Sequence, residues 1–270
     1  MKRISILLMG VTVFSSLFFG SCNKDDDNDS TNTPTTPVET RSFAKEIKEN
    51  GFLSAKLEYT NNLLTKFTNY DTTGASNGYG TIEYSNSLPS LFKSFDKNDN
   101  LEYKLETVIS NGKIVKLKEY YDSDNDGQID YASYDTIYYN GSKISKKESF
   151  NKSTGEKNSY STYVWTGNNI TERKSYYKNY NTDEFILSET YTYTFDTKKN
   201  PMYNIGIGKL FNDVESLSEN NITKETSLSA YNNSTTVYEN VIEYNSKSYP
   251  TKITETNTTT NNKDITEYNY

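Results

Sequence analysis

Hydrophobic and polar side chains alternate along most of this chain, in short runs separated by turns that contain asparagine. In the run 187–195, Leu187, Tyr191, Tyr193 and Phe195 fall on one face, and serine and threonine side chains fall on the other. Alternation with a period of two is typical of a strand with one buried and one solvated face, as found in antiparallel sheets. The pattern therefore predicts an antiparallel β protein.

The alternating runs belong to one recurring unit, in which an aromatic strand, an asparagine-containing turn and an Ile-x-Lys or Ile-Thr-Glu strand follow each other. Asparagine and glycine tolerate the positive φ angles that two-residue hairpins require. Such turns occur at Asn61-Asn62, Asn111-Gly112, Asn140-Gly141, Asn168-Asn169 and Asn245-Ser246. The fold class we expect is all-β, an antiparallel β-meander of repeated hairpins that forms a rolled open sheet or a barrel.

Two segments depart from this rhythm. The segment 41–50 allows either a short helix or an opening strand. In 200–219, Leu210, Val214 and Leu217 have helical spacing, which predicts one short helix and loop inserted against the concave face of the sheet. That insertion would be a structural plug or, alternatively, the wall of a ligand pocket.

The first 21 residues have the pattern of a secretory signal. Lys2 and Arg3 precede an apolar run over 4–19, and Gly20-Ser21 then leads to Cys22. A transmembrane anchor is the alternative, but the run is short for a span. Small residues before a cysteine resemble a bacterial lipobox, although Phe19 stands where leucine is usual. The resemblance implies that Cys22 is lipidated and attaches the protein to the membrane through its N-terminal lipid.

Residues 22–40 have the composition of a disordered tether, rich in Thr, Pro and Asn. Lys24, followed by three aspartates, resembles the surface-export signal of Bacteroidota lipoproteins. We therefore expect an outer-membrane lipid anchor and a location at the cell surface, with the periplasmic face as the alternative. The remaining residues, 41–270, are expected to form a single repeat β domain.

Composition limits the available chemistry. The chain has 25 tyrosines, one cysteine and no histidine, so the usual general base and the Cys/His metal sites are missing. Removal of residues 1–21 leaves 27 basic against 36 acidic residues, a net charge of −9. This acidity argues against nucleic acid as a partner. Because no catalytic motif is present either, we do not expect an enzyme.

An acidic loop over 122–130 is the clearest candidate site. It matches the pattern D-x-D-x-D-G-x-x-D and offers oxygen ligands from Asp122, Asp124, Asp126, Gln128 and Asp130. Calcium (Ca2+) takes six to eight such oxygens, so the loop predicts a calcium-stabilised hairpin. It resembles the calcium loops of integrin α-type propellers and thrombospondin type 3 repeats rather than an EF-hand. A solvated acidic hairpin tip is the alternative.

Aromatic residues suggest a second candidate, a stacking platform for glycans. Its members would be Tyr138, Tyr163, Trp165, Tyr176 and Tyr177. Cross-strand packing within the sheet is the alternative interpretation of the same residues.

The segments FDTKKNP (195–201) and YNSKSYPTKI (244–253) resemble tyrosine-aspartate (YD/RHS-like) repeats. Together with the lipobox, they are similar to uncharacterised Bacteroidota surface lipoproteins whose domain of unknown function is described as porin-like in fold. The resemblance implies an all-β sheet or barrel without enzymatic activity. Most of the Gly-Arg and Gly-Asn turns of YD repeats are missing here. A membrane-spanning porin is not expected, because runs such as 113–119 carry charges throughout.

These observations predict a cell-envelope lipoprotein of unknown specific activity. Its role would be that of a non-catalytic binding or structural module, with an envelope protein as a candidate partner. The alternative is a surface glycan-binding protein of a nutrient-uptake system. A hydrolase that uses two acids in a sheet cleft is the third hypothesis.

Overall fold

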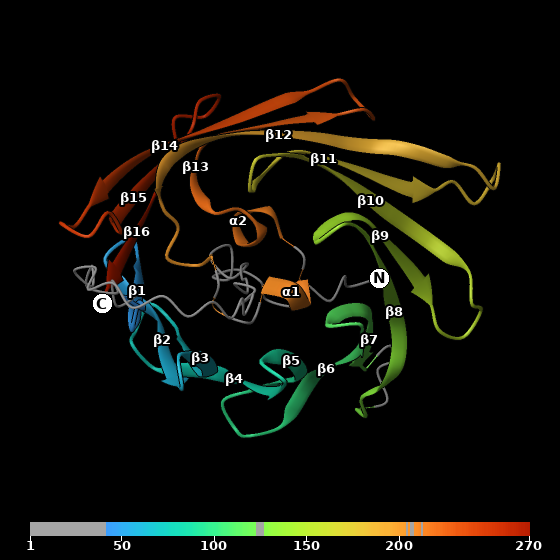
Figure 1. Cartoon of the computed structure of the whole chain (residues 1–270), viewed down its shortest axis with the longest axis horizontal. Coiled ribbons are helices and arrows are strands. Elements are labelled where there is room, and N and C mark those ends of the chain that lie inside the picture. Colours follow the sequence, from blue (N-terminus) through green and yellow to red (C-terminus); the bar gives the residue numbers. More distant parts are fainter. Residues whose placement is uncertain (1–41, 123–126, 204, 206–207, 212) are drawn as a thin grey trace, which may run out of the picture.

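The chain folds into a closed antiparallel β-barrel in the computed structural model (Figure 1), which describes residues 42–122, 127–203, 205, 208–211 and 213–270. Each strand pairs with the strands before and after it in the chain, and the first strand, β1, pairs with the last, β16. The prediction of an all-β antiparallel meander is therefore confirmed, and the barrel is the correct one of its two forms. The predicted signal sequence, the lipidation site Cys22 and the tether lie outside the described residues.

Sixteen strands are present within the described part of the chain. They are β1 (Glu46–Glu49), β2 (Phe52–Thr60), β3 (Leu63–Tyr70), β4 (Ser76–Ser85), β5 (Leu88–Phe95), β6 (Leu101–Ser110), β7 (Lys113–Tyr121), β8 (Asp130–Asn140), β9 (Lys143–Asn151), β10 (Lys157–Thr166), β11 (Asn169–Lys178), β12 (Phe185–Lys199), β13 (Asn220–Ser229), β14 (Thr235–Tyr244), β15 (Pro250–Asn257) and β16 (Lys263–Asn269).

The described part of the ambiguous segment, residues 42–50, contains a strand and no helix. Its β1 pairs with both β2 and β16, and Ile47 is buried in the core. The segment is thus the element through which the barrel closes.

The tight hairpin turns follow the predicted chemistry. Asn61 and Asn62 have φ angles of 51° and 63°, and Asn111 and Gly112 have φ angles of 50° and 67°. Positive φ at both central positions matches the right-handed twist of the two flanking strands, which is why asparagine and glycine occupy them. Both of these turns join an even-numbered strand to the next odd-numbered one, so they lie at the same end of the barrel, which we call the tight-turn end. The turn Asn50-Gly51 between β1 and β2 has the same positive φ angles but lies at the opposite end.

At the tight-turn end, the pairing register between the two strands of a hairpin shifts close to the turn. Examples are the shift between Glu58 and Tyr59 in β2 and the shift between Val164 and Trp165 in β10. A shift of this kind bends the strand and increases its twist. The aromatic side chain after the shift then donates to a backbone carbonyl. The hydroxyl of Tyr84 donates a hydrogen bond to Leu64 O at 2.7 Å, and that of Tyr139 donates to Ile114 O at 2.8 Å. The indole nitrogen of Trp165 donates to Ile144 O at 2.8 Å.

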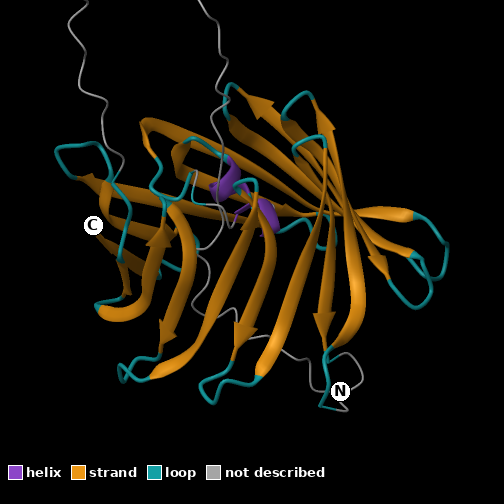
Figure 2. Ribbon diagram, turned by 60° about the horizontal axis from the view of Figure 1, so that its bottom comes forward, coloured by secondary structure: helices purple, strands orange, loops and turns teal. Residues whose placement is uncertain are grey.

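The predicted insertion lies between β12 and β13, inside the ring of strands (Figures 1 and 2). It contains two single helical turns, α1 (Gly208–Phe211) and α2 (Val214–Leu217), rather than the one short helix predicted, so Leu210 lies in a different turn from Val214 and Leu217. Leu210, Val214 and Leu217 are each 1% exposed and pack with the inward-facing side chains of the barrel wall. The insertion therefore supplies part of the core that the strands alone do not provide.

Asn200 fixes the start of this insertion. Its amide nitrogen donates to Glu215 O at 2.7 Å and Ser218 O at 3.0 Å, and its side-chain oxygen accepts from the Met202 amide at 2.8 Å. Since Asn200 is only 8% exposed, these bonds satisfy polar groups that water reaches poorly.

Among the described residues, no helix has the length and apolar character needed to cross a membrane.

Candidate functional site

The acidic loop 122–130 connects β7 to β8. The Gly127 amide donates to Asp122 Oδ2 at 3.1 Å, and Gly127 has a φ of 86°, which suits a sharp turn. Asp130 begins β8 and is exposed. The two central ligands, Asp124 and Asp126, lie outside the described residues. The rest of the chain that the structure describes contains no group of three or more His, Cys, Asp or Glu side chains arranged to share an ion. The calcium site stays a prediction.

The five predicted platform aromatics do not share one face. Tyr163 points into the barrel and is 8% exposed. Trp165 is half-buried, and its indole nitrogen donates a hydrogen bond to Ile144 O on the neighbouring strand β9. Tyr176 and Tyr177 are consecutive in β11 and therefore point to opposite faces. On the outside, Tyr138 is 44% exposed and donates to Glu148 Oε2 at 2.9 Å.

The outer wall instead carries stacked aromatic pairs that join neighbouring strands. Their ring centroids are 4.4–5.2 Å apart in Tyr79–Phe95, Tyr120–Tyr131, Tyr134–Phe150 and Tyr160–Tyr176. Lysine ammonium groups lie over several of these rings. Lys116 Nζ is 3.5 Å from the centroid of Tyr134, and Lys146 Nζ is 4.6 Å from that of Tyr160. Because these ring faces are already covered, the pairs act as cross-strand packing and lend no support to a glycan platform.

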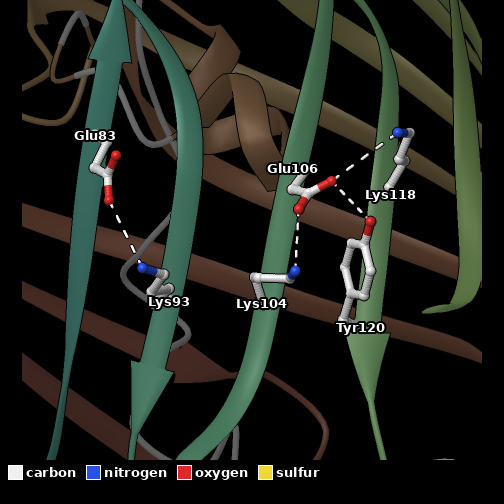
Figure 3. Close-up of polar contacts among 6 residues, drawn as sticks. All are labelled: Glu83, Lys93, Lys104, Glu106, Lys118 and Tyr120. Atoms are coloured by element: carbon white, nitrogen blue, oxygen red, sulfur yellow. Dashed lines mark hydrogen bonds and ion pairs between the residues drawn. The ribbon is translucent and has the colours of Figure 1, made fainter. Parts of the chain in front are cut away.

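Ion pairs occupy the outer wall between these aromatic pairs (Figure 3). Glu106 on β6 contacts Lys104 at 3.0 Å and Lys118 at 4.0 Å, and it accepts a hydrogen bond from Tyr120 at 2.7 Å. Lys93 and Glu83 form a neighbouring pair at 3.8 Å.

Similar pairs continue around the barrel. They are Lys174–Glu172 at 2.9 Å, Lys224–Glu239 at 2.9 Å and Lys252–Glu243 at 3.4 Å. A barrel that spans a membrane needs an outward apolar band about 25 Å tall. The outer wall of this barrel is charged on strands from β4 to β15, so it is suited to water.

The inner wall carries a different set of charges. Lys147 on β9 forms an ion pair with Asp135 on β8, with 2.8 Å between Nζ and Oδ2, and Asp135 is only 4% exposed. Beside this pair, Glu119 on β7 accepts a hydrogen bond from Ser133 Oγ at 2.7 Å. We call Glu119, Asp135 and Lys147 the inner ion-pair cluster.

Burial and charge act against each other in this cluster. Burial raises the pKa of Glu119, and nearby Asp135 adds to that effect, whereas Ser133 and Lys147 oppose it. Burial is the largest single influence on the pKa of Lys147 and lowers it, but the charge and hydrogen bond of Asp135, together with Tyr163 and Glu119, outweigh burial, and the net pKa is raised. The cluster therefore holds Lys147 in its charged form.

A second group of charges surrounds α2. Arg173 on β11 lies over the Tyr191 ring, with 4.2 Å from the guanidinium carbon to the ring centroid. Burial raises the pKa of Glu225 on β13 to about 7, although Arg173 opposes the shift. Burial also raises the pKa of Glu255 on β15 and, well above its usual value, that of Glu215 in α2. These carboxyl groups hold protons more tightly than exposed ones do.

Sequence reasoning did not single out either inner group. Charged residues occupy both faces of most strands, and the faces can be told apart only when the register of each hairpin is known. Glu119 and Asp135 have the parity of their buried strand neighbours Leu117 and Ile137, so alternation alone could have placed them on the inner face. Lys147 and Arg173 differ in parity from the buried Ile144 and Ile170, because a register shift lies between each pair, and alternation could not have placed them.

The fold defines a large closed β-barrel whose outer wall is charged and whose inner wall holds a helical insertion. It is similar to a porin-like protein from Bacteroides vulgatus, with a TM-score of 0.53 and 12% identity over 85% of this chain and 99% of that one. A porin-like protein from Bacteroides uniformis has a TM-score of 0.47 and 11% identity over 85% and 98% of the two chains. At this identity the likeness concerns the fold alone. No protein-family model and no curated protein matches the chain.

Proposed function

We propose that this protein is a lipid-anchored, non-catalytic module of the cell envelope, a binding or structural protein whose barrel stands in water rather than in the bilayer. The charged outer wall carries the proposal, because ion pairs such as Lys104–Glu106 and Lys224–Glu239 lie where a membrane-spanning barrel would face lipid. In this proposal, the lipid on Cys22 is the attachment to the membrane, and the aspartates after Lys24 direct the protein to the cell surface.

Membrane attachment can be tested by fractionating cells that express the full chain or its Cys22→Ala variant. The wild-type chain is expected in the membrane fraction and to resist a carbonate wash, whereas Cys22→Ala is expected in the soluble fraction with its barrel intact. A Cys22→Ala barrel that stays in the washed membrane would show that the strands themselves are inserted. Addition of protease to intact cells then separates the cell surface, where the protein is degraded, from the periplasmic face, where it survives.

We further propose that calcium stabilises the hairpin formed by β7 and β8. The spacing of Asp122, Asp124, Asp126 and Asp130 supports this proposal. Calorimetric titration of residues 41–270 with CaCl2 is expected to release heat in the wild type and none in Asp124→Ala.

The matched control for this titration is Asp96→Ala. Asp96 caps another hairpin loop by accepting hydrogen bonds from the backbone amides of Asn98 and Asn100, both at 2.8 Å. Because this loop is separate from the predicted calcium site, the Asp96→Ala variant should leave the heat of calcium binding unchanged. Equal heat from Asp124→Ala and the wild type, or no heat from either, would end the calcium proposal.

A further inference from the structure

The α2 turn is attached to the inner wall at the tight-turn end of the barrel. The backbone amide of Ile170 donates to Ser218 Oγ at 3.1 Å, and the amide of Glu219 donates to Asn168 O, also at 3.1 Å. Val214 and Leu217 are each 1% exposed, and α2 packs against β11. These two hydrogen bonds, the bonds from Asn200 to Glu215 O and Ser218 O, and a short apolar face together hold α2 in position.

The charges that surround α2 oppose this arrangement. Glu215 in α2 interacts with its neighbour Asp213, with Glu225 on β13 and with Glu255 on β15. Arg173 on β11 is the counter-charge for Asp213 and Glu225. The other titratable groups that face these residues are Tyr163 on β10, Glu189, Tyr191 and Tyr193 on β12, and Asp264 and Tyr268 on β16. One guanidinium therefore faces several carboxyl groups.

We propose that α2 is a pH-sensitive element of the barrel, which packs against the inner wall while Glu215 and Glu225 are protonated and loosens from it when both are charged. At acidic pH, neutral carboxyl groups can lie together without repulsion. At alkaline pH, Asp213, Glu215, Glu225 and Glu255 all carry negative charge, and Arg173 neutralises one of them. Glu215 comes from the insertion, whereas Glu225 and Glu255 come from the wall, so their repulsion acts across the contact that holds α2.

The sign of the pH effect follows from the direction of the shifts. Burial raises the pKa of both Glu215 and Glu225, so the packed state binds protons more tightly than a loosened state does. The contribution of protonation to packing is complete below the ordinary glutamate pKa of about 4.5 and is lost as the pH rises through about 7 for Glu225. The contact should therefore be firm at pH 5 and weak at pH 8.

Hydrogen–deuterium exchange can test this proposal on the chain 22–270 with Cys22→Ala, which leaves it unlipidated. The reporters are the backbone amides of Leu217, Ser218 and Glu219, which bond Asp213 O, Val214 O and Asn168 O. After correction for the intrinsic pH dependence of exchange, we expect their protection to fall at least about tenfold from pH 5 to pH 8. Peptides from β4 to β7 should keep their protection, because the barrel itself stays closed.

Glu215→Gln is the decisive variant, and it should retain protection of these amides at pH 8. Glu239→Gln, on the outer wall, is the matched control and should lose protection as the wild type does. Equal protection at both pH values, or equal loss across β4 to β7, would overturn the proposal. A Glu215→Gln variant that loses protection at pH 8 as the wild type does would also overturn it. If Glu215→Gln does not fold, the same outcome in Glu225→Gln would overturn it.

Discussion

The ion pair between Lys147 and Asp135 makes a sharp prediction, because an outer-wall pair of nearly the same length provides its control. The inner pair is 2.8 Å long with side chains 23% and 6% exposed, whereas Lys224–Glu239 is 2.9 Å long with side chains 44% and 54% exposed. Distance alone would give the two pairs the same energy. The surroundings of the charges must therefore decide the difference.

The magnitude can be worked from these distances. With an effective dielectric constant of about 20, charges 2.8 Å apart attract each other by about 6 kcal/mol, and with that of water the outer pair gains about 1.4 kcal/mol. Removing the lysine from the inner pair leaves Asp135 buried and unpaired, which costs about 3–5 kcal/mol. Removing the lysine from the outer pair should cost less than about 1 kcal/mol.

Urea unfolding of Lys147→Met and Lys224→Met, followed by tyrosine fluorescence, measures both losses. With a slope near 3 kcal/mol per molar urea, the inner variant should shift the midpoint down by about 1 M or more. The double variant Asp135→Leu/Lys147→Met should recover most of the lost stability, because the buried charge of Asp135 is removed together with its partner. Equal losses from the two lysine variants, or no recovery in the double variant, would refute the assignment of the pair to a buried site.

Three further outcomes follow from individual contacts. Asn200→Ala should lower the free energy of unfolding by about 1–3 kcal/mol, because two buried carbonyls lose their donor; an unchanged urea midpoint would contradict this. Glu148→Gln should cost about 1 kcal/mol at pH 7 and little at pH 2. Burial alone would raise the pKa of Glu148, but bonds from two lysines and a tyrosine outweigh burial and lower this pKa to about 2. The contribution of the Glu148 charge to stability is therefore present above pH 4.5 and is lost as the pH falls. Equal losses of stability at both pH values would contradict this. Gly80→Ala should cost about 1–3 kcal/mol, because a β-carbon there would overlap the rings of Phe67 and Phe92, and adding Phe67→Leu should restore part of the loss in thermal unfolding.

The strands were predictable because their determinants are local. The alternating run 187–195 lies within β12, and the predicted turn at Asn111-Gly112 separates β6 from β7. The position of the insertion was predictable for the same reason, since Leu210, Val214 and Leu217 lie close together in sequence, but its division into α1 and α2 was not. A positive φ angle or a periodic apolar face leaves its mark on a few neighbouring residues.

Closure of the barrel and the inner charges were not predictable in this way. β1 has only four residues, and its partner β16 lies at the other end of the chain, so no local pattern distinguishes a closed barrel from an open sheet. The meeting of Asp135 with Lys147 depends on the register of β8 and β9, and the charges around α2 depend on where the insertion folds back. Both are consequences of tertiary structure.

Closure through β1 and β16 also determines how the barrel can assemble in time. Every other strand pair joins neighbours in sequence and can form as a hairpin, but Ile47 meets Tyr268 only after nearly the whole chain is available. Until then the sheet has two unpaired edges, and such edges can pair with other molecules. A contact of such long sequence separation is slow to form. The final joining of the first and last strands is therefore the step at which folding competes most directly with aggregation.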